Sequence, residues 1–165
     1  MKWRNGITAF CLLGALVLSG CKEDQVSVGA QAPALAAYDL AGQQVDLSRW
    51  QGKNVYLNFW SSGCGGCMVE MGALEKLSKE YGDKVVVVAV NTDPDGVDIT
   101  SMLAHHNVTY PVVRDQLGIT KERYQVSGTP TSFIIDANGK VTDQHQGARD
   151  EAQLTALFQK LASRT

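Results

Sequence analysis

The hydrophobic pattern along the chain predicts alternating strands and helices. Two short apolar runs, residues 54–60 (NVYLNFW) and 84–90 (KVVVVAV), are typical of strands that are buried on both faces. Between them, apolar residues recur at helical spacing from Cys67 to Tyr81. These segments predict a right-handed βαβ unit. Such a unit delivers the loop after its first strand to the carboxyl edge of the sheet, where sites form in open α/β sheets.

The rest of the pattern predicts a hairpin on each side of this unit, and further helices. Residues 38–50 (YDLAGQQVDLSRW) resemble a small N-terminal hairpin that turns at its Ala-Gly pair. Residues 131–147 (TSFIIDANGKVTDQHQG) predict two strands joined by an Asn-Gly turn. Between the βαβ unit and this second hairpin, residues 94–115 predict a helix and a short extended segment, and residues 118–126 predict another helical turn or two. Residues 150–161 predict an amphipathic C-terminal helix.

The N-terminus has the pattern of an export signal. Two basic residues precede an apolar run over residues 7–18, which is shorter than the roughly 20 residues that a membrane-spanning helix needs. The run ends in LSGC, which resembles the bacterial lipobox, in which Cys21 would be lipidated through its thiol. The sequence therefore predicts a signal peptide over 1–20, a tether over 21–32 and one domain over 33–165. The protein would be a bacterial lipoprotein that is anchored to a membrane and faces the periplasm or the cell exterior.

Cysteine counting leaves one pair for chemistry. Of the four cysteines, Cys11 would leave with the signal peptide and Cys21 would carry lipid, so Cys64 and Cys67 remain. A zinc site needs three or four protein ligands, and the three histidines show no ligand-like spacing. We therefore predict no metal site. One pair with a two-residue gap also makes no structural disulfide framework, which leaves redox chemistry.

Composition is that of an ordinary globular domain. The formal net charge is −2, and loss of residues 1–20 would remove two basic residues and no acid. The chain thus has no basic excess that would favour nucleic acid. The roughly 140 remaining residues suit one domain with a single core, and we expect a monomer.

Three stretches together resemble one protein family. They are residues 28–53, residues 54–77 with the motif CGGC, and residues 126–141 with the motif GTPT. Together they resemble the TlpA/ResA-type thiol-disulfide oxidoreductases, a membrane-tethered, redoxin-like (AhpC/TSA-like) branch of the thioredoxin superfamily. The resemblance implies a thioredoxin-like α/β fold, in which helices flank a central mixed sheet. The N-terminal hairpin would extend this fold, and an insert would lie between the βαβ unit and the strand after Pro130.

The position of the cysteine pair suggests a role for each sulfur. If Cys64 opens the helix, unpaired N–H groups and the helix dipole favour its thiolate, which makes it the attacking nucleophile. Cys67, one turn inward, would resolve the mixed disulfide, and the two would form the redox-active disulfide. An inert buried disulfide is the alternative.

The resemblance implies supporting residues around the pair. The peptide bond between Thr129 and Pro130 should be cis and should place the Thr129 backbone where it can pair with a substrate strand. Trp60 is assigned to substrate binding beside the pair, with a plain core position as the alternative. Glu70, three residues after the second cysteine, would manage the proton of Cys67, with a solvated surface glutamate as the alternative.

The resemblance also implies the activity. We expect a protein-disulfide oxidoreductase that acts as a reductant on disulfide-bearing proteins, in cytochrome c maturation or a similar process. A membrane thiol reductase would supply its electrons, and no cofactor is implied because the dithiol itself carries two electrons. The alternative from another class is a copper-handling chaperone that uses both thiolates and His145.

The motif departs from the family pattern in its glycines. Gly63 stands where a bulky residue is common, Gly66 replaces a proline between the cysteines, and Gly72 stands where a kinking proline is common. Glycine disfavours a helix interior by about 1 kcal/mol relative to alanine, so the Gly63–Gly66 stretch loosens the helix start. Gly72 permits a bend without enforcing it.

We predict that these glycines change the redox potential of the pair, and access to it, without abolishing the chemistry. Replacement of Gly66 by proline should therefore shift the measured reduction potential of the Cys64–Cys67 couple. A potential that stays within error of the wild-type value would contradict this prediction.

Overall fold

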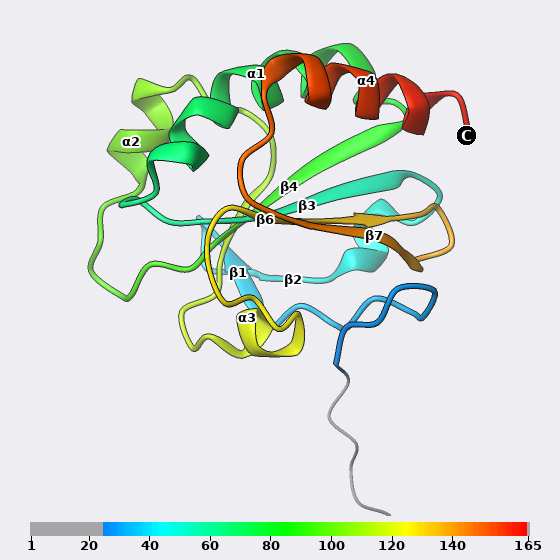
Figure 1. Ribbon diagram of the computed structural model, residues 1–165. Coiled ribbons are helices and arrows are strands. Elements are labelled where there is room, and N and C mark those ends of the chain that lie inside the picture. The colour runs from blue at the N-terminus through cyan, green and yellow to red at the C-terminus, as the bar shows by residue number, and fades with distance from the viewer. Residues whose placement is uncertain (1–24, 165) are drawn as a thin grey trace, which may run out of the picture.

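The computed structural model describes residues 25–164, which form a seven-stranded mixed sheet with helices on both of its faces (Figure 1). The first half of the chain contains β1 (Ala37–Asp39), β2 (Gln44–Val45), the 3-10 helix η1 (Leu47–Trp50), β3 (Asn54–Trp60), α1 (Gly65–Tyr81) and β4 (Val85–Asn91). The second half contains α2 (Thr100–His105), β5 (Val112–Arg114), α3 (Ile119–Arg123), β6 (Thr131–Ile135), β7 (Val141–Gln146) and α4 (Glu151–Ala162).

The sheet has the order β2-β1-β5-β4-β3-β6-β7. Strands β3, β4 and β5 run parallel, whereas β6, β7, β1 and β2 each pair antiparallel with their neighbours. Strand β3 lies near the middle, and all seven of its residues are buried. Its carboxyl end therefore opens into the loop that leads to Cys64, as the βαβ pattern predicts.

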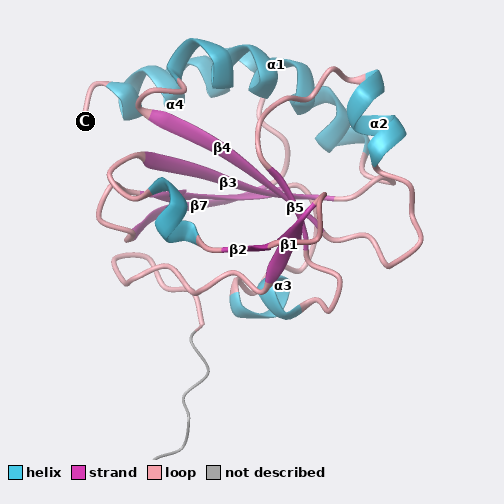
Figure 2. Ribbon diagram, turned by 180° about the vertical axis from the view of Figure 1, so that it is seen from behind, coloured by secondary structure: helices cyan, strands magenta, loops and turns pink. Residues whose placement is uncertain are grey.

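The helices divide between two layers, and each layer has its own core. Helices α1, α2 and α4 cover one face of the sheet, and α3 covers the other (Figures 1 and 2). The first core joins α1, α2 and α4 to β3 and β4, and it includes Cys67 and Met71. The second core lies beneath α3 and includes Tyr124, whose hydroxyl donates to the carbonyl of Pro33 at 2.8 Å. The cysteine-bearing helix is thus held from below by the sheet and from the side by α4.

The fold prediction is confirmed, and one detail differs from it. The helix and the short extended segment expected within residues 94–115 are α2 and β5, and the chain turns between them at Asn107 (φ 54°). The tether expected over 21–32 is bonded to the domain in the part that is described. Gly29 donates to the carbonyl of Val141 at 2.7 Å, and Ala32 donates to that of Gly139 at 2.8 Å. The ordered domain therefore begins before residue 33.

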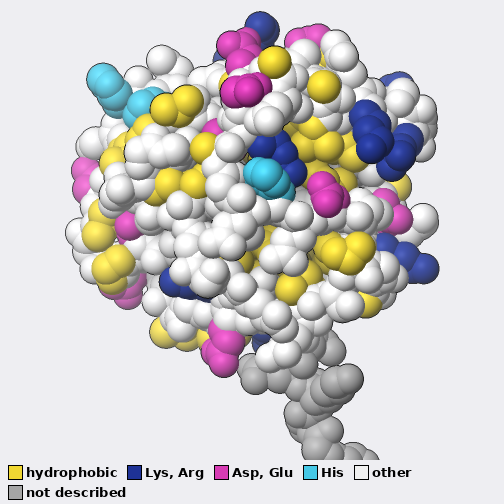
Figure 3. Space-filling model, in the orientation of Figure 1, with side chains coloured by type: hydrophobic (Ala, Val, Ile, Leu, Met, Phe, Trp, Pro, Cys, Tyr) yellow, Lys and Arg dark blue, Asp and Glu magenta, His cyan; other side chains and the backbone are white. Residues whose placement is uncertain are grey.

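The surface mixes polar and apolar side chains. In the view of Figure 3, acidic and basic side chains are interspersed with hydrophobic ones. None of the helices within residues 25–164 is long and apolar enough to span a bilayer.

Phe158 joins the two long helices to the sheet. Its ring is fully buried, and its centroid lies 5.5 Å from that of Tyr56 on β3 and 6.2 Å from that of Tyr81 on α1. Replacement of Phe158 by alanine should lower the free energy of unfolding by about 3–5 kcal/mol, because the cavity is lined from three elements. Urea denaturation measures this loss, with Lys160→Ala on the exposed face of α4 as the control. A loss below about 1 kcal/mol would contradict the packing described.

Candidate active site

Helix α1 begins at the cysteine pair. Cys64 is the N-cap residue with an extended backbone (φ −95°, ψ 100°), and its Sγ accepts the backbone N–H of Cys67 at 3.1 Å. The sulfur therefore takes the place that a serine or aspartate oxygen takes in most N-caps. A negative charge on this sulfur is favoured by the bond and by the positive end of the helix dipole.

The two cysteines form a disulfide and differ in exposure. Their S–S distance is 2.00 Å, and their Cα atoms are 5.3 Å apart. Cys64 is partly exposed, whereas Cys67 is 1% exposed and belongs to the core beneath α1. Solvent can therefore reach Cys64, whereas Cys67 is buried behind it.

The loop before Cys64 is held by a buried aspartate that the sequence reasoning missed. Asp93, 8% exposed, follows β4. Its carboxylate accepts the Ser62 backbone N–H at 2.8 Å, the Ser62 hydroxyl at 3.0 Å and the Asn91 amide at 2.7 Å. The βαβ pattern carried a signal for it, because β4 runs parallel to β3 and ends at the same sheet edge.

The segment with GTPT lies against the same edge. The Thr129–Pro130 peptide bond is cis, and the Thr129 hydroxyl shares a hydrogen bond of 3.0 Å with the hydroxyl of Ser61. Pro130 lies beside the first turn of α1, since a Cβ at Gly66 would be 3.6 Å from its Cδ. The two sequence motifs, some sixty residues apart in the chain, therefore meet in space.

Only one of the motif's glycines is in close contact. A Cβ at Gly66 would lie 3.1 Å from the Cβ of Ala148, which is closer than side chains normally pack. At Gly63, Gly65 and Gly72, a Cβ would meet nothing within 4 Å. A side chain or proline ring at position 66 therefore requires Ala148 to move, whereas the other three glycines leave open space around the cysteines.

Glu70 is buried, unlike a solvated surface glutamate. It is 1% exposed, and its Oε1 accepts the backbone N–H of Arg149 at 2.7 Å, while its Oε2 has no hydrogen-bond partner. Burial raises the pKa of its carboxyl above the ordinary value near 4.5, against the opposing effects of Arg149 and of the Asn58 amide. A position three residues after Cys67 on one helix places the two side chains on the same face.

Arg149 was also missed by the sequence reasoning. It lies in the loop between β7 and α4, and its side chain is 11% exposed. One guanidinium nitrogen donates to the hydroxyls of Ser132 and Tyr56, and the other lies 3.7 Å from the carboxylate of Asp143. No local sequence signal marks this residue, because its hydrogen bonds go to Tyr56 and Ser132, which lie 93 and 17 residues away in the chain.

Trp60 lies in the core, which was the alternative to a substrate-binding role. It is 1% exposed and packs in the same cluster as Cys67 and Met71. A substrate has no access to its ring in this structure, because β3 is buried on both faces. The substrate-binding assignment of Trp60 is therefore replaced by one of core support.

The described part of the chain contains no cluster of side chains that could bind a metal. Within residues 25–164, no group of three or more His, Cys, Asp or Glu side chains is placed to hold a metal. His145 lies on β7 opposite Ser132, and its pKa is lowered by burial and by the charge of Arg149. The predicted lipid site, Cys21, lies outside the described residues.

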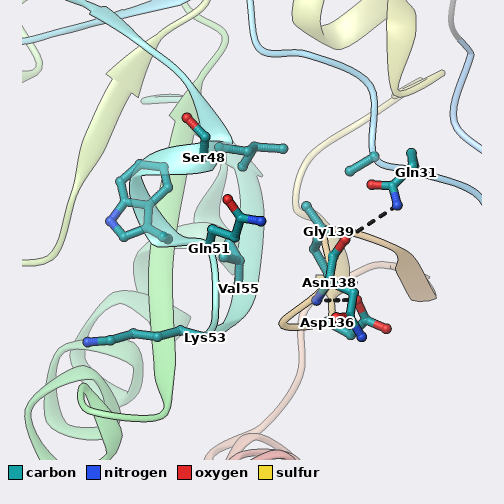
Figure 4. A pocket seen from close by; sticks show the side chains of 12 residues that line it. Gln31, Ser48, Gln51, Lys53, Val55, Asp136, Asn138 and Gly139 are labelled. Atoms are coloured by element: carbon teal, nitrogen blue, oxygen red, sulfur yellow. Dashed lines mark hydrogen bonds between the residues drawn. The ribbon is translucent and has the colours of Figure 1, made fainter.

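A hollow of about 230 Å³ lies at the opposite end of β3 (Figure 4). The side chains that line it include Gln31 from the N-terminal segment, Gln51 after η1 and Asn138 from the β6–β7 turn. Gln31 donates to the Asn138 carbonyl at 3.3 Å, on the side of the hollow that faces Gln51 and Val55 (Figure 4). The hollow is far from the cysteines along the strand, and it takes no part in the site described above.

Known proteins share this arrangement. The family model described as Redoxin matches residues 27–159. Thioredoxin-like protein YneN of Bacillus subtilis (strain 168) is 34% identical over 161 residues, which cover 93% of this chain and 94% of that protein. Thiol-disulfide oxidoreductase ResA of Bacillus thuringiensis subsp. konkukian (strain 97-27) is 32% identical over 141 residues, which cover 85% of this chain and 82% of that protein.

Solved structures agree with these relatives. The crystal structure of a DsbE-type thiol:disulfide interchange protein from Chlorobium tepidum superposes with a TM-score of 0.76 at 37% identity, covering 86% of this chain and all of that one. The resemblance to TlpA/ResA-type proteins is confirmed, and so is the thioredoxin-like fold. This chain therefore belongs to the Redoxin family and is a thiol-disulfide oxidoreductase of the ResA and DsbE type.

Proposed function

We propose that this protein is a lipid-anchored, extracytoplasmic reductant of protein disulfides. The observation that carries the proposal is the difference between its two sulfurs. Cys64 is partly exposed at the N-terminus of α1, and Cys67 is buried directly behind it. The anchor and the location rest on the sequence of residues 1–21, with its basic start, its apolar run and its LSGC ending.

The first step is attack by the reduced protein on a substrate disulfide. The Cys64 thiolate attacks one substrate sulfur, which forms a mixed disulfide and releases the other substrate sulfur as a thiolate. The N-cap position supports this role, because the Cys67 N–H that now contacts Cys64 Sγ stabilises charge on that atom. The exposed glycines on both sides of Cys64 leave room for a folded substrate to approach.

The second step resolves the mixed disulfide. Cys67, as a thiolate, attacks Cys64 Sγ, which forms the intramolecular disulfide and releases the second substrate thiolate. The substrate gains two electrons, and the protein dithiol loses them. The role of Glu70 is to accept the Cys67 proton as this thiolate forms, which its buried place one turn further along α1 supports.

Substrate contact is assigned to the segment around the cis bond. Thr129 is partly exposed, and its backbone lies at the sheet edge beside α1. An extended substrate segment that pairs with this backbone would bring its disulfide to Cys64. Val69, which is 75% exposed on α1, adds an apolar contact on the adjoining surface.

Turnover requires an external dithiol. Each cycle leaves the Cys64–Cys67 disulfide, which is the form in the structure. A membrane thiol reductase is the proposed electron donor, because the extracytoplasmic space is oxidising. The proposed substrates are disulfide-bearing proteins, with cytochrome c maturation or a similar process as the setting.

Replacement of Cys67 by serine should trap substrates on Cys64. The variant can form the mixed disulfide but cannot resolve it, so partners should remain bound and be released by reductant on a non-reducing gel. The matched control is Cys64→Ser, which should trap nothing and should reduce insulin at under about 1% of the wild-type rate, because the attacking sulfur is gone. Equal trapping by the two variants would contradict the assigned roles, and a wild-type protein that reduces no protein disulfide would overturn the function.

The stability of the disulfide form should depend on pH through Glu70. Because its folded-state pKa is raised, the carboxyl contributes stability that is present below about pH 4.5 and is lost as pH rises through the folded value. Wild-type protein should therefore lose stability relative to Glu70→Gln as pH rises from 4 to 8.

Urea unfolding of both oxidised proteins across this pH range measures that difference. Glu80→Gln, on the exposed side of the same helix, controls for loss of a carboxylate from α1. A wild-type minus Glu70→Gln difference that is flat, or that grows with pH, would show that the carboxyl is not held in a desolvated place.

A further inference from the structure

Arg149 is a nearly buried cation beside the site, and the reaction described above does not use it. Its side chain is 11% exposed, and its guanidinium forms a long ion pair of 3.7 Å with the carboxylate of Asp143, whose own side chain is 56% exposed. Burial of a charge is costly unless close partners compensate for it. The long ion pair with the exposed Asp143 compensates weakly, so most of the compensation comes from the Tyr56 and Ser132 hydroxyls and from the charge of Glu70.

The contacts of Arg149 connect Glu70 to the sheet. Its backbone N–H donates to Glu70 Oε1 at 2.7 Å. Its guanidinium donates to the Tyr56 hydroxyl of β3 at 3.3 Å and to the Ser132 hydroxyl of β6, and it lies 6.0 Å from the centroid of the Tyr56 ring. The side chain therefore fixes the loop whose backbone holds the carboxylate of α1.

The hydrogen bond from the Arg149 backbone is the main support of the buried Glu70 carboxylate. Oε2 is buried and has no partner, so one oxygen carries no compensation for lost water. In such a place a carboxylate ionises only if nearby charge and a donor favour the ionised form. Arg149 supplies both, through its guanidinium and its backbone amide.

We propose that Arg149 is a positioning residue of the thiol-disulfide reaction, which holds Glu70 in place and keeps it ionised so that it can accept the Cys67 proton. This inference rests on the proton-accepting role of Glu70 proposed above. It adds that the loop between β7 and α4 governs the pH range in which the resolving cysteine is active. Arg149 acts through Glu70 and has no contact with a reacting sulfur in the structure.

The other groups around Glu70 do not replace Arg149. Tyr56 on β3 faces it, and Tyr110 before β5 responds to its charge; burial first, and nearby carboxylates second, raise the pKa of both phenols, so both stay neutral at neutral pH. Asn58 on β3 is an uncharged amide. His145 and Asp143 on β7 interact with Arg149 itself. The charge of Arg149 helps to lower the pKa of His145, and Asp143 forms an ion pair with the guanidinium. The cysteine pair on α1 is uncharged as a disulfide.

The direct test is the titration of Glu70 in the oxidised protein. Carbon-13 NMR of the Glu70 side-chain carboxyl, followed against pH, gives its pKa in wild-type, Arg149→Lys and Arg149→Gln proteins. Arg149→Gln should raise this pKa by about one unit, because it removes the charge. Arg149→Lys keeps the charge but loses the forked hydrogen bonds, so the Glu70 pKa in this variant should fall between the values in wild type and in Arg149→Gln. A Glu70 pKa in Arg149→Gln that matches wild type would overturn the proposal.

A second readout separates positioning from a merely structural role. The pH midpoint of insulin reduction should move upward in Arg149→Gln, by a shift similar to that of the Glu70 titration. In the Glu70→Gln background, Arg149→Gln should cause no further shift, because the group through which it acts is absent. Equal shifts in both backgrounds would show that Arg149 acts without Glu70, and would overturn the proposal.

Two controls keep these outcomes distinct. Arg123→Gln removes a partly exposed arginine whose side chain bonds only the Ala34 carbonyl, at 2.9 Å, among the contacts described, and it should leave the Glu70 titration unchanged. If Arg149→Gln unfolds, Arg149→Lys serves in its place because it preserves the cation. A Glu70 pKa in Arg149→Lys that equals the wild-type value, while NMR spectra show that the β7–α4 loop has moved, would overturn the positioning role. Failure of the proposed function would appear separately, as a wild-type protein that reduces no disulfide.

Discussion

The active site depends on the bond between the Cys67 backbone N–H and the Cys64 sulfur. That bond exists because α1 begins at residue 64, directly after the buried strand β3 and its short loop. A helix that began one residue later would leave Cys64 outside the N-cap position, where its sulfur accepts this N–H. The aspartate after β4 secures this register, since Asp93 holds the loop through both the backbone and the side chain of Ser62. Sheet, loop and helix start are therefore one unit.

Beneath the sulfurs, the protein tolerates an arrangement that does not serve stability. Glu70 is buried with one oxygen unpaired, and Arg149 is nearly buried with a long ion pair of 3.7 Å to Asp143. Replacement of such groups by well-packed apolar residues is often neutral or stabilising in proteins. Their joint presence, one turn from the buried cysteine and linked by a hydrogen bond of 2.7 Å, is consistent with a function that needs a movable proton.

The sequence was informative where the signal was local or periodic. Strands β3 and β4 follow from their apolar runs, and α1 from its spacing, so the placement of Cys64 at a helix start was predictable. The burial of β3 over all seven residues removes the alternation that tells one face from the other, which is why the direction of Trp60 remained open. Arg149 meets Glu70 at a separation of 79 residues, and no local pattern records such a contact. The docked N-terminal segment was hidden for another reason: its bonds are made by backbone groups, as at Gly29 and Ala32, which composition does not reveal.

The docked N-terminal segment lies away from the cysteine pair. Residues 29–32 bind at the turn between β6 and β7, whereas Pro130 and the cysteines lie at the other end of β6. Upstream of residue 29, Val26 also donates to the carbonyl of Arg123 at 2.8 Å, at the end of α3. The N-terminal segment is therefore attached to the domain at two places, and neither of them is the start of α1. The docked segment thus leaves the Cys64 sulfur uncovered, so that the same chain can bind its own N-terminal residues and still present a partly exposed disulfide.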